Sequence, residues 1–159
     1  MQAQLCWALA AIAVLAALPR AQSAEKHHAQ AASAKEKLIG AWRLVSLDEP
    51  GSGGKIKHVT DQKGMLIYTR DGHMSVQLMY PPSASSLTND YVKNGYEASF
   101  GSYDVDEAKH TVIHHVQGSI TEGLVGKNLP RVYQFAEDGH LIIKSANPAE
   151  HWQVVWEHY

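Results

Sequence analysis

Apolar and polar residues alternate along most of the chain after Gly40, and turn-forming residues interrupt this alternation roughly every ten residues. A period of two is typical of β-strands that bury one face. We expect an all-β fold in which sequential antiparallel strands close into an up-and-down barrel of about eight or nine strands. The pattern predicts strands over residues 41–48, 55–60, 64–70, 73–80, 99–106, 110–118, 131–137, 140–146 and 151–158.

Three segments depart from the alternation. The stretch AKEKLIG, residues 34–40, predicts one short helical turn before the first strand. Residues 81–100 begin with two prolines, which end a strand, and they predict a short helix from about Thr88. Residues 118–130 predict a second long loop. We expect both of these longer segments to cap a mouth of the barrel.

The sequence TRDGH, residues 69–73, predicts a tight hairpin turn. It has the form of a type I turn with Gly72 in the left-handed conformation and a G1 bulge. This register pairs Thr69 with His73 and Tyr68 with Met74. It places on one apolar face of the hairpin Leu66, Tyr68, Met74, Val76, Leu78 and Tyr80.

Alternation in the other strands extends this apolar face into a barrel interior. In the first strand, Trp42, Leu44 and Ser46 are expected to share one face. A barrel of about eight strands can hold one small ligand, and ligand sites usually combine apolar walls with a few polar anchors. The inward residues expected to contact such a ligand are Trp42, Leu66, Tyr68, Met74, Val76, Leu78, Tyr103, His114, Val116, Arg131, Tyr133 and Trp156.

The stretch TVIHHVQGS, residues 111–119, contains two adjacent histidines with different expected surroundings. His114 shares its face with valines and is expected inside the barrel, whereas His115 shares its face with Gln117 and is expected at the surface. Side chains on opposite faces of a strand cannot bind one metal ion. His110 and His114 share a face, but roughly 13 Å of strand separates them, too far for a common ion. We therefore expect no metal site.

Two polar residues of the expected interior have alternative roles. His114 is either a hydrogen-bonded core residue or a catalytic group. Arg131 carries a charge that is hardly ever buried without an acceptor. It is either an anion anchor in a ligand pocket or a strut packed over an aromatic ring such as Trp42 or Trp156.

The first residues differ from the rest of the chain. The apolar run LCWALAAIAVLAALP and the small residues after it predict an export signal over residues 1–24. Residues 25–36 are expected to form a flexible lead-in, in which His27 and His28 are solvated, and residues 37–159 a single barrel domain. We expect a periplasmic or secreted mature protein without a membrane span.

Composition limits the possible partners and chemistry. Removal of the expected signal lowers Lys+Arg from 14 to 13 against 16 Asp+Glu, a net charge of −3, because Arg20 is its only charged residue. This charge is too small to indicate nucleic acid or an anionic membrane as a partner. The only cysteine, Cys6, lies in the expected signal, so the mature chain has neither a disulfide nor a thiol nucleophile. The oligomeric state stays open.

The sequence contains no strong catalytic signature: it lacks G-x-S-x-G, a phosphate-binding loop and H-E-x-x-H. We therefore expect a protein that binds a small hydrophobic molecule without a cofactor and without catalysis. One alternative is a cofactor-independent isomerase or cyclase, in which His114 is the base and Tyr68 or Tyr103 the acid. The other is a structural envelope protein whose barrel is filled by its own side chains.

Several motifs of the chain together have the form of a known family. They are GAW at residues 40–42 within LIGAWRLVS, the stretches KGMLIYTRDGHMSVQLM, FGSYDVD and VIHHVQGS, and the pair Gly126 and Arg131. GAW matches the G-x-W of the first lipocalin strand, and over roughly residues 37–158 the chain resembles the lipocalin-like domain family of bacterial and fungal proteins. The resemblance implies a calycin-type antiparallel barrel and binding of a small hydrophobic molecule.

The chain also departs from the family pattern. Arg70 stands where the turn usually carries proline, and Gln117 replaces a frequent acidic residue, which removes a possible carboxylate partner of the outward histidine. His158 stands where arginine is common. In lipocalins a late arginine packs over the first-strand tryptophan, so Arg131 or His158 is expected to take that part over Trp42.

Overall fold

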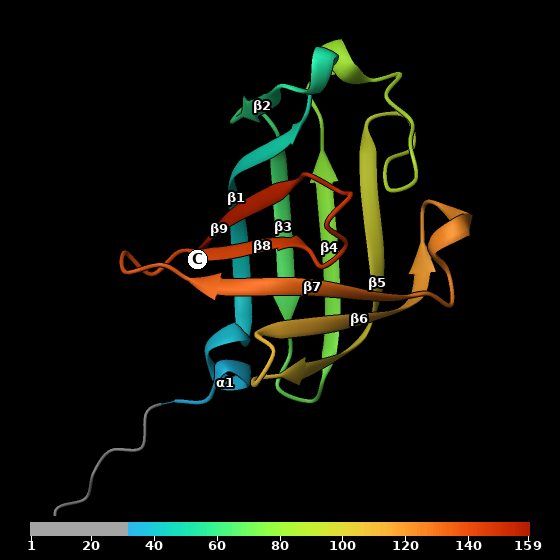
Figure 1. Ribbon diagram of the computed structural model, residues 1–159. Coiled ribbons are helices and arrows are strands. Elements are labelled where there is room, and N and C mark those ends of the chain that lie inside the picture. The colour runs from blue at the N-terminus through green and yellow to red at the C-terminus, as the bar shows by residue number, and fades with distance from the viewer. Residues whose placement is uncertain (1–31) are drawn as a thin grey trace, which may run out of the picture. The chain divides into compact units, whose positions relative to one another are not determined.

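The computed structural model describes residues 32–159. The expected export signal and most of the expected lead-in, with His27 and His28, lie outside the described residues. Within residues 32–159 no helix has the length and apolarity needed to cross a membrane. The described elements (Figure 1) are α1 (Ala34–Leu38), β1 (Gly40–Pro50), β2 (Ile56–Val59), β3 (Lys63–Tyr68), β4 (His73–Met79), β5 (Tyr96–Asp106), β6 (Thr111–Ser119), β7 (Asn128–Phe135), β8 (Leu141–Ser145), β9 (Gln153–His158) and the short 3-10 helices η1 (Ser52–Gly54), η2 (Pro82–Ala84) and η3 (Glu122–Leu124).

The strands form one antiparallel sheet in the order β2-β1-β3-β4-β5-β6-β7-β8-β9. Because β1 also pairs with β9, β1 and β3 to β9 close into an eight-stranded barrel, and β2 extends the sheet outside it. The predicted all-β, up-and-down barrel is confirmed. Each predicted strand is present, with its ends shifted by at most three residues.

The helix α1 lies at one end of the barrel (Figure 1). It begins with a capping box, in which Ser33 Oγ accepts from the Glu36 amide and the Glu36 carboxylate accepts from the Ser33 amide. Leu38 is fully buried, and its carbonyl accepts a 2.8 Å hydrogen bond from Trp42 Nε1. The helical turn predicted over residues 34–40 is therefore present, and it overlaps the last three residues of the expected lead-in.

The β3–β4 hairpin has the register that its turn sequence predicted. Tyr68 pairs with Met74, and the Thr69 amide donates to the His73 carbonyl at 2.9 Å. Gly72 has a φ of +90°, which glycine adopts without a steric penalty. Local turn chemistry therefore sets which face of both strands points inward.

A bulge in β1 breaks the simple alternation. The register against β9 shifts between Leu44 and Ser46, so that Ser46 pairs with Val155 and Leu47 with Val154. Leu47 and Val154 both face the interior, where they line the cavity described below. The predicted common face of Leu44 and Ser46 is wrong, because the bulge adds one residue to the strand.

The segment between β4 and β5 is less helical than predicted. It contains the 3-10 turn η2, but no helix forms from Thr88. Instead, the Asn89 side chain accepts hydrogen bonds from the amides of Tyr91 and Val92, at 2.8 and 2.9 Å. Asparagine often competes with helix formation in this way. Strand β5 then begins at Tyr96, three residues earlier than expected.

Candidate functional site

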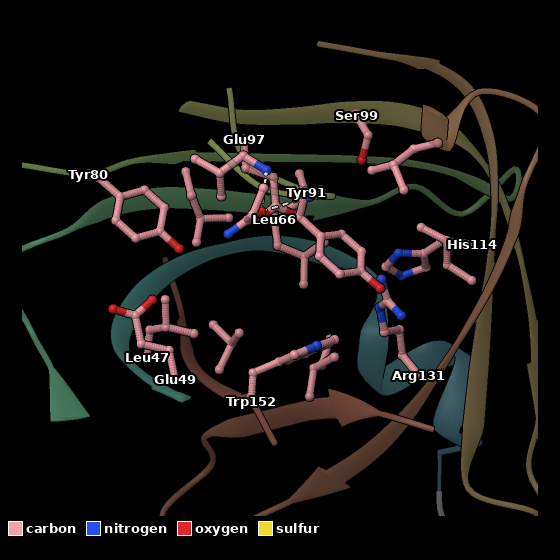
Figure 2. Close-up of a pocket in the computed structure, with 18 of the residues that line it drawn as sticks. Leu47, Glu49, Leu66, Tyr80, Tyr91, Glu97, Ser99, His114, Arg131 and Trp152 are labelled. Atoms are coloured by element: carbon pink, nitrogen blue, oxygen red, sulfur yellow. Dashed lines mark hydrogen bonds between the residues drawn. The ribbon is translucent and has the colours of Figure 1, made fainter. Parts of the chain in front are cut away.

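A cavity of about 400 Å³ lies inside the barrel (Figure 2). Its size lies in the range of small-molecule sites. Most of its wall is apolar. The aliphatic and proline side chains that line it are Leu47, Pro50, Leu66, Val76, Leu78, Leu87, Val92, Leu124, Leu129, Ile143 and Val154.

Loops complete the wall where the strands end. The segment between η2 and β5 contributes Leu87, Asn89, Tyr91 and Val92, and η3 contributes Leu124. The loop before β9 contributes Trp152. Both segments that we expected to cap the barrel mouth therefore contribute to the cavity wall.

The buried core divides into two parts according to contact with this cavity. We call the core residues that do not line it the packed half: Leu38, Trp42, Tyr68, Met74, Tyr103, Val112, Tyr133 and Leu141. We call the core residues that line it the hollow half: Leu47, Leu66, Val76, Leu78, Ile143, Val154 and Trp156. Four aromatic rings fill the packed half, whereas mainly aliphatic side chains surround the hollow half and leave the space between them empty.

The predicted ligand-contacting residues fall into both parts of the interior. Those that line the cavity are Leu66, Val76, Leu78, His114, Arg131 and Trp156. Those that do not line it are Trp42, Tyr68, Met74, Tyr103, Val116 and Tyr133, all of them buried. Alternation therefore identified interior positions, but it carried no information about which end of the barrel is open.

His114 lies in the cavity wall and is 6% exposed. Its Nε2 is 2.6 Å from the Tyr68 hydroxyl, which lies behind it in the packed half. Burial, together with the positive charge of Arg131, lowers the pKa of His114 to about 3, so the imidazole is neutral. Burial also raises the pKa of Tyr68. The third candidate for catalysis, Tyr103, donates its hydroxyl to the Thr69 carbonyl at 2.9 Å.

His115 points to the outside of the barrel, and its side chain is 33% exposed. Its ring nitrogens contact Asn128 Oδ1 at 2.7 Å and Asp104 Oδ2 at 2.9 Å. Hydrogen bonds to Asn128 and Asp104 raise the pKa of His115. Asp104 supplies the carboxylate that we expected to be missing because of Gln117. Among residues 32–159 no group of three His, Cys, Asp or Glu side chains is arranged to hold a metal ion.

Arg131 is 7% exposed and lines the cavity. Its guanidinium carbon lies 5.3 Å from the ring centroid of Tyr91 and 4.8 Å from that of Trp152. Arg131 thus packs against aromatic rings, but these are Tyr91 and Trp152 and not the Trp42 or Trp156 that we named as examples. The first-strand Trp42 is instead covered by His158, whose ring centroid is 4.5 Å away.

Several polar groups of the cavity lie at its two ends, and Glu97 and Ser99 lie between these ends (Figure 2). Arg131 and His114 lie at one end, next to the packed half, and Glu49 and Tyr80 lie at the other. Burial raises the pKa of Tyr80, and the charges of Glu49 and Glu97 raise it further. Burial also raises the pKa of Glu97 to about 7, although the charge of Arg131 opposes this shift.

Sequence reasoning missed several residues of the wall. Tyr91 and Trp152 lie in loops, where no period indicates their direction. Glu49 follows the β1 bulge, which reverses the alternation. Glu97 was missed because the predicted strand began too late. Glu97 lies an even number of residues from Ser99 and Tyr103, which puts the three on the same face of a strand. A predicted strand that began earlier would therefore have placed the Glu97 side chain on the inward face.

A closed eight-stranded antiparallel barrel with an apolar cavity at one end has the architecture of the calycin class of proteins. A family model described as "Lipocalin-like domain" matches residues 39–158, and the chain belongs to this family. No curated protein matches the sequence.

Proposed function

We propose that the protein binds a small, mostly hydrophobic molecule inside its barrel. The cavity of about 400 Å³ with apolar walls is the observation that supports this function. Ligand sites commonly combine such walls with a few polar groups, and here Arg131 and His114 lie together at one end of the cavity. The cavity also favours binding over the alternative of a barrel filled by its own side chains.

The arrangement of the polar groups favours binding over catalysis. A base with a pKa of about 3 is a weak proton acceptor at neutral pH, and His114 has that property. The two tyrosines considered as acids, Tyr68 and Tyr103, do not line the cavity. A molecule in the cavity would therefore meet His114 without either proposed acid beside it.

We test binding by titrating the protein with N-phenyl-1-naphthylamine, a neutral apolar probe whose fluorescence rises on burial. The wild-type protein should bind it saturably. Ser99→Phe should weaken binding at least tenfold, since Ser99 is buried in the cavity wall and a phenyl ring there would occupy the empty space.

The same substitution on the other face of β5 provides the matched control. Ser102 lies three residues farther along the strand and does not line the cavity, so Ser102→Phe should leave probe binding unchanged. Circular dichroism would verify that both variants fold. A wild-type protein without saturable binding, or a folded Ser99→Phe protein that binds as tightly as wild type, would contradict the proposed function.

We further propose that the protein acts outside the cytoplasm. The apolar run of residues 5–19 and the small residues after it support an export signal. The intact mass of the protein isolated from its own host should correspond to cleavage after Ser23 or Ala24. Recovery of only the uncleaved chain from the cytoplasm would contradict export.

A further inference from the structure

The guanidinium of Arg131 lacks a carboxylate partner. Within residues 32–159 no carboxylate lies within 4.0 Å of it, and its Nη1 donates to the carbonyl of Pro130 at 3.4 Å. A guanidinium has five N–H donors, and a buried one is costly unless acceptors surround it. Most of the hydrogen-bonding capacity of this buried charge is therefore available to another molecule.

The contact with the Trp152 ring does not use this capacity, whereas the Tyr91 hydroxyl takes up part of it, since a hydrogen bond with Arg131 opposes the rise in the pKa of Tyr91 that burial causes. Aromatic rings interact with the flat face of a guanidinium through cation–π attraction. The N–H donors point outward in the plane of the group, away from a ring stacked on that face. The rings orient the guanidinium and leave its remaining N–H donors available.

Glu150 holds these two rings in place. Its carboxylate accepts from the Tyr91 hydroxyl at 3.0 Å and from Trp152 Nε1 at 2.9 Å, so it ties the loop before β5 to the loop before β9. Glu150 neither lines the cavity nor lies within 4.0 Å of Arg131. Its hydrogen bonds run to the two aromatic side chains that contact the guanidinium, and not to the guanidinium itself.

Two carboxyl groups line the cavity, Glu49 and Glu97, and neither forms an ion pair with Arg131. Glu97 lines the same cavity, yet within residues 32–159 its side chain has no hydrogen-bond or ion-pair partner. The guanidinium of Arg131 therefore presents donors to the cavity without a carboxylate partner, so a ligand that supplies acceptor atoms suits the wall better than one that supplies only donors.

We propose that the cavity binds an amphipathic carboxylate, with its anionic group on the edge of Arg131 and its apolar body against Leu66, Leu78 and Val154. This inference rests on the proposed ligand-binding function and names its ligand class. A carboxylate matches the planar fork of a guanidinium with two parallel hydrogen bonds. Glu150 is a positioning residue, because it fixes the rings that orient the guanidinium.

The test compares three ligands that share one alkyl chain: decanoate, 1-decanol and decylamine. Each is titrated calorimetrically into the full-length protein at neutral pH. Decanoate should bind at least tenfold more tightly than decanol, and decylamine should bind most weakly. Arg131→Gln should lower decanoate affinity at least tenfold and change decanol affinity by less than twofold.

Arg43→Gln is the matched control for the loss of one positive charge. Arg43 is exposed and pairs with Glu157 at 2.8 Å, so its replacement should leave both affinities unchanged. Glu150→Ala should lower decanoate affinity several-fold without changing decanol affinity, and Glu150→Gln, which retains one acceptor oxygen, should restore part of the loss. Because Glu150 lies outside the cavity, this pair tests the inference even if Arg131→Gln does not fold.

The outcomes separate this inference from the function on which it rests. If decanoate and decanol bind equally, or if Arg131→Gln weakens both alike, the protein binds apolar molecules but the anion site is wrong. Preferred binding of decylamine would also overturn it. If no ligand binds and the neutral fluorescent probe fails as well, the binding function itself is wrong and the carboxylate site falls with it.

Discussion

The two halves of the barrel interior follow the same alternation but differ in what fills them. In the packed half, the inward positions carry Trp42, Tyr68, Tyr103 and Tyr133, whose rings occupy the space enclosed by the strands. In the hollow half, the corresponding positions carry mainly leucine, valine and isoleucine, and a cavity of about 400 Å³ remains.

This difference separates stability from binding within one barrel. Aromatic residues bury large areas and make many close contacts, so the packed half contributes disproportionately to the folding free energy. Residues of the hollow half already face empty space on one side and lose fewer contacts when they are shortened. The same contrast explains why a guanidinium without a carboxylate partner is tolerated at Arg131, and a carboxyl group without a hydrogen-bond partner at Glu97, where a ligand or water can approach.

The largest expected effect comes from truncation in the packed half. Tyr68→Ala should lower the free energy of unfolding by about 3–5 kcal/mol, as large-to-small core substitutions do. Leu78→Ala in the hollow half should cost about 2 kcal/mol, the lower end of the range for leucine. Urea denaturation followed by circular dichroism would measure both. Equal losses at the two positions would contradict the division of the core.

The next effect concerns His114, which lies at the boundary between the halves. Its folded pKa of about 3 lies below the unfolded value of 6.5, so its contribution to stability is present above pH 6.5 and is lost as the pH falls. The loss should be about 1.4 kcal/mol per pH unit, roughly 2 kcal/mol between pH 6.5 and about pH 5.

The measurement must compare wild type with His114→Gln, which does not titrate. Burial raises the folded pKa of Glu97 to about 7, so the contribution of Glu97 to stability grows on acidification, opposite to that of His114. Both proteins contain Glu97, so its contribution cancels when their stabilities are subtracted. We expect the stability advantage of wild type over His114→Gln to shrink as the solution is acidified. A constant difference would show that His114 is not buried in neutral form.

The fold was predictable because its signals are local. The period of two, the hairpin turn at residues 69–73 and the interrupting turn residues each specify direction over a few positions, and together they determined the barrel. Where a local signal failed, a specific residue caused it. The β1 bulge moved Leu47 and Glu49 to the interior, and Asn89 replaced a predicted helix with side-chain hydrogen bonds.

The site was predictable only in part, because it depends on long-range closure. Arg131 was a candidate from its unusual burial, and its two possible roles, anion anchor and aromatic strut, turn out to be compatible. Its partners Tyr91 and Trp152 lie in irregular loops about forty and twenty residues away in the chain. No periodic pattern relates such segments, so their meeting at Arg131 follows only from the closed barrel.

A smaller effect tests the electrostatics of the hollow half. Decanoate affinity should fall by up to about tenfold as the pH rises through about 7, because Glu97 loses its proton and its charge then repels the ligand carboxylate. Of the other cavity groups, His114 has a pKa of about 3 and Tyr80 a raised pKa, so neither titrates there. Calorimetric titrations of decanoate would measure the slope. Glu97→Gln should abolish it, and decanol binding should show no slope in either protein.

The smallest effect comes from His115, one residue from His114 but on the outer surface. Its hydrogen bonds to Asn128 and Asp104 raise its folded pKa above 6.5. Its contribution is therefore fully present below pH 6.5 and is lost as the pH rises through the folded value.

An exposed pair of this kind contributes only a few tenths of a kcal/mol. On going from mildly acidic to alkaline solution, wild type should therefore lose a few tenths of a kcal/mol of stability relative to His115→Gln. This pH dependence is opposite in sign to the one expected for His114. High salt should reduce the difference. A loss on acidification instead would mean that the two neighbouring imidazoles share one environment, which a strand separating a barrel interior from solvent does not allow.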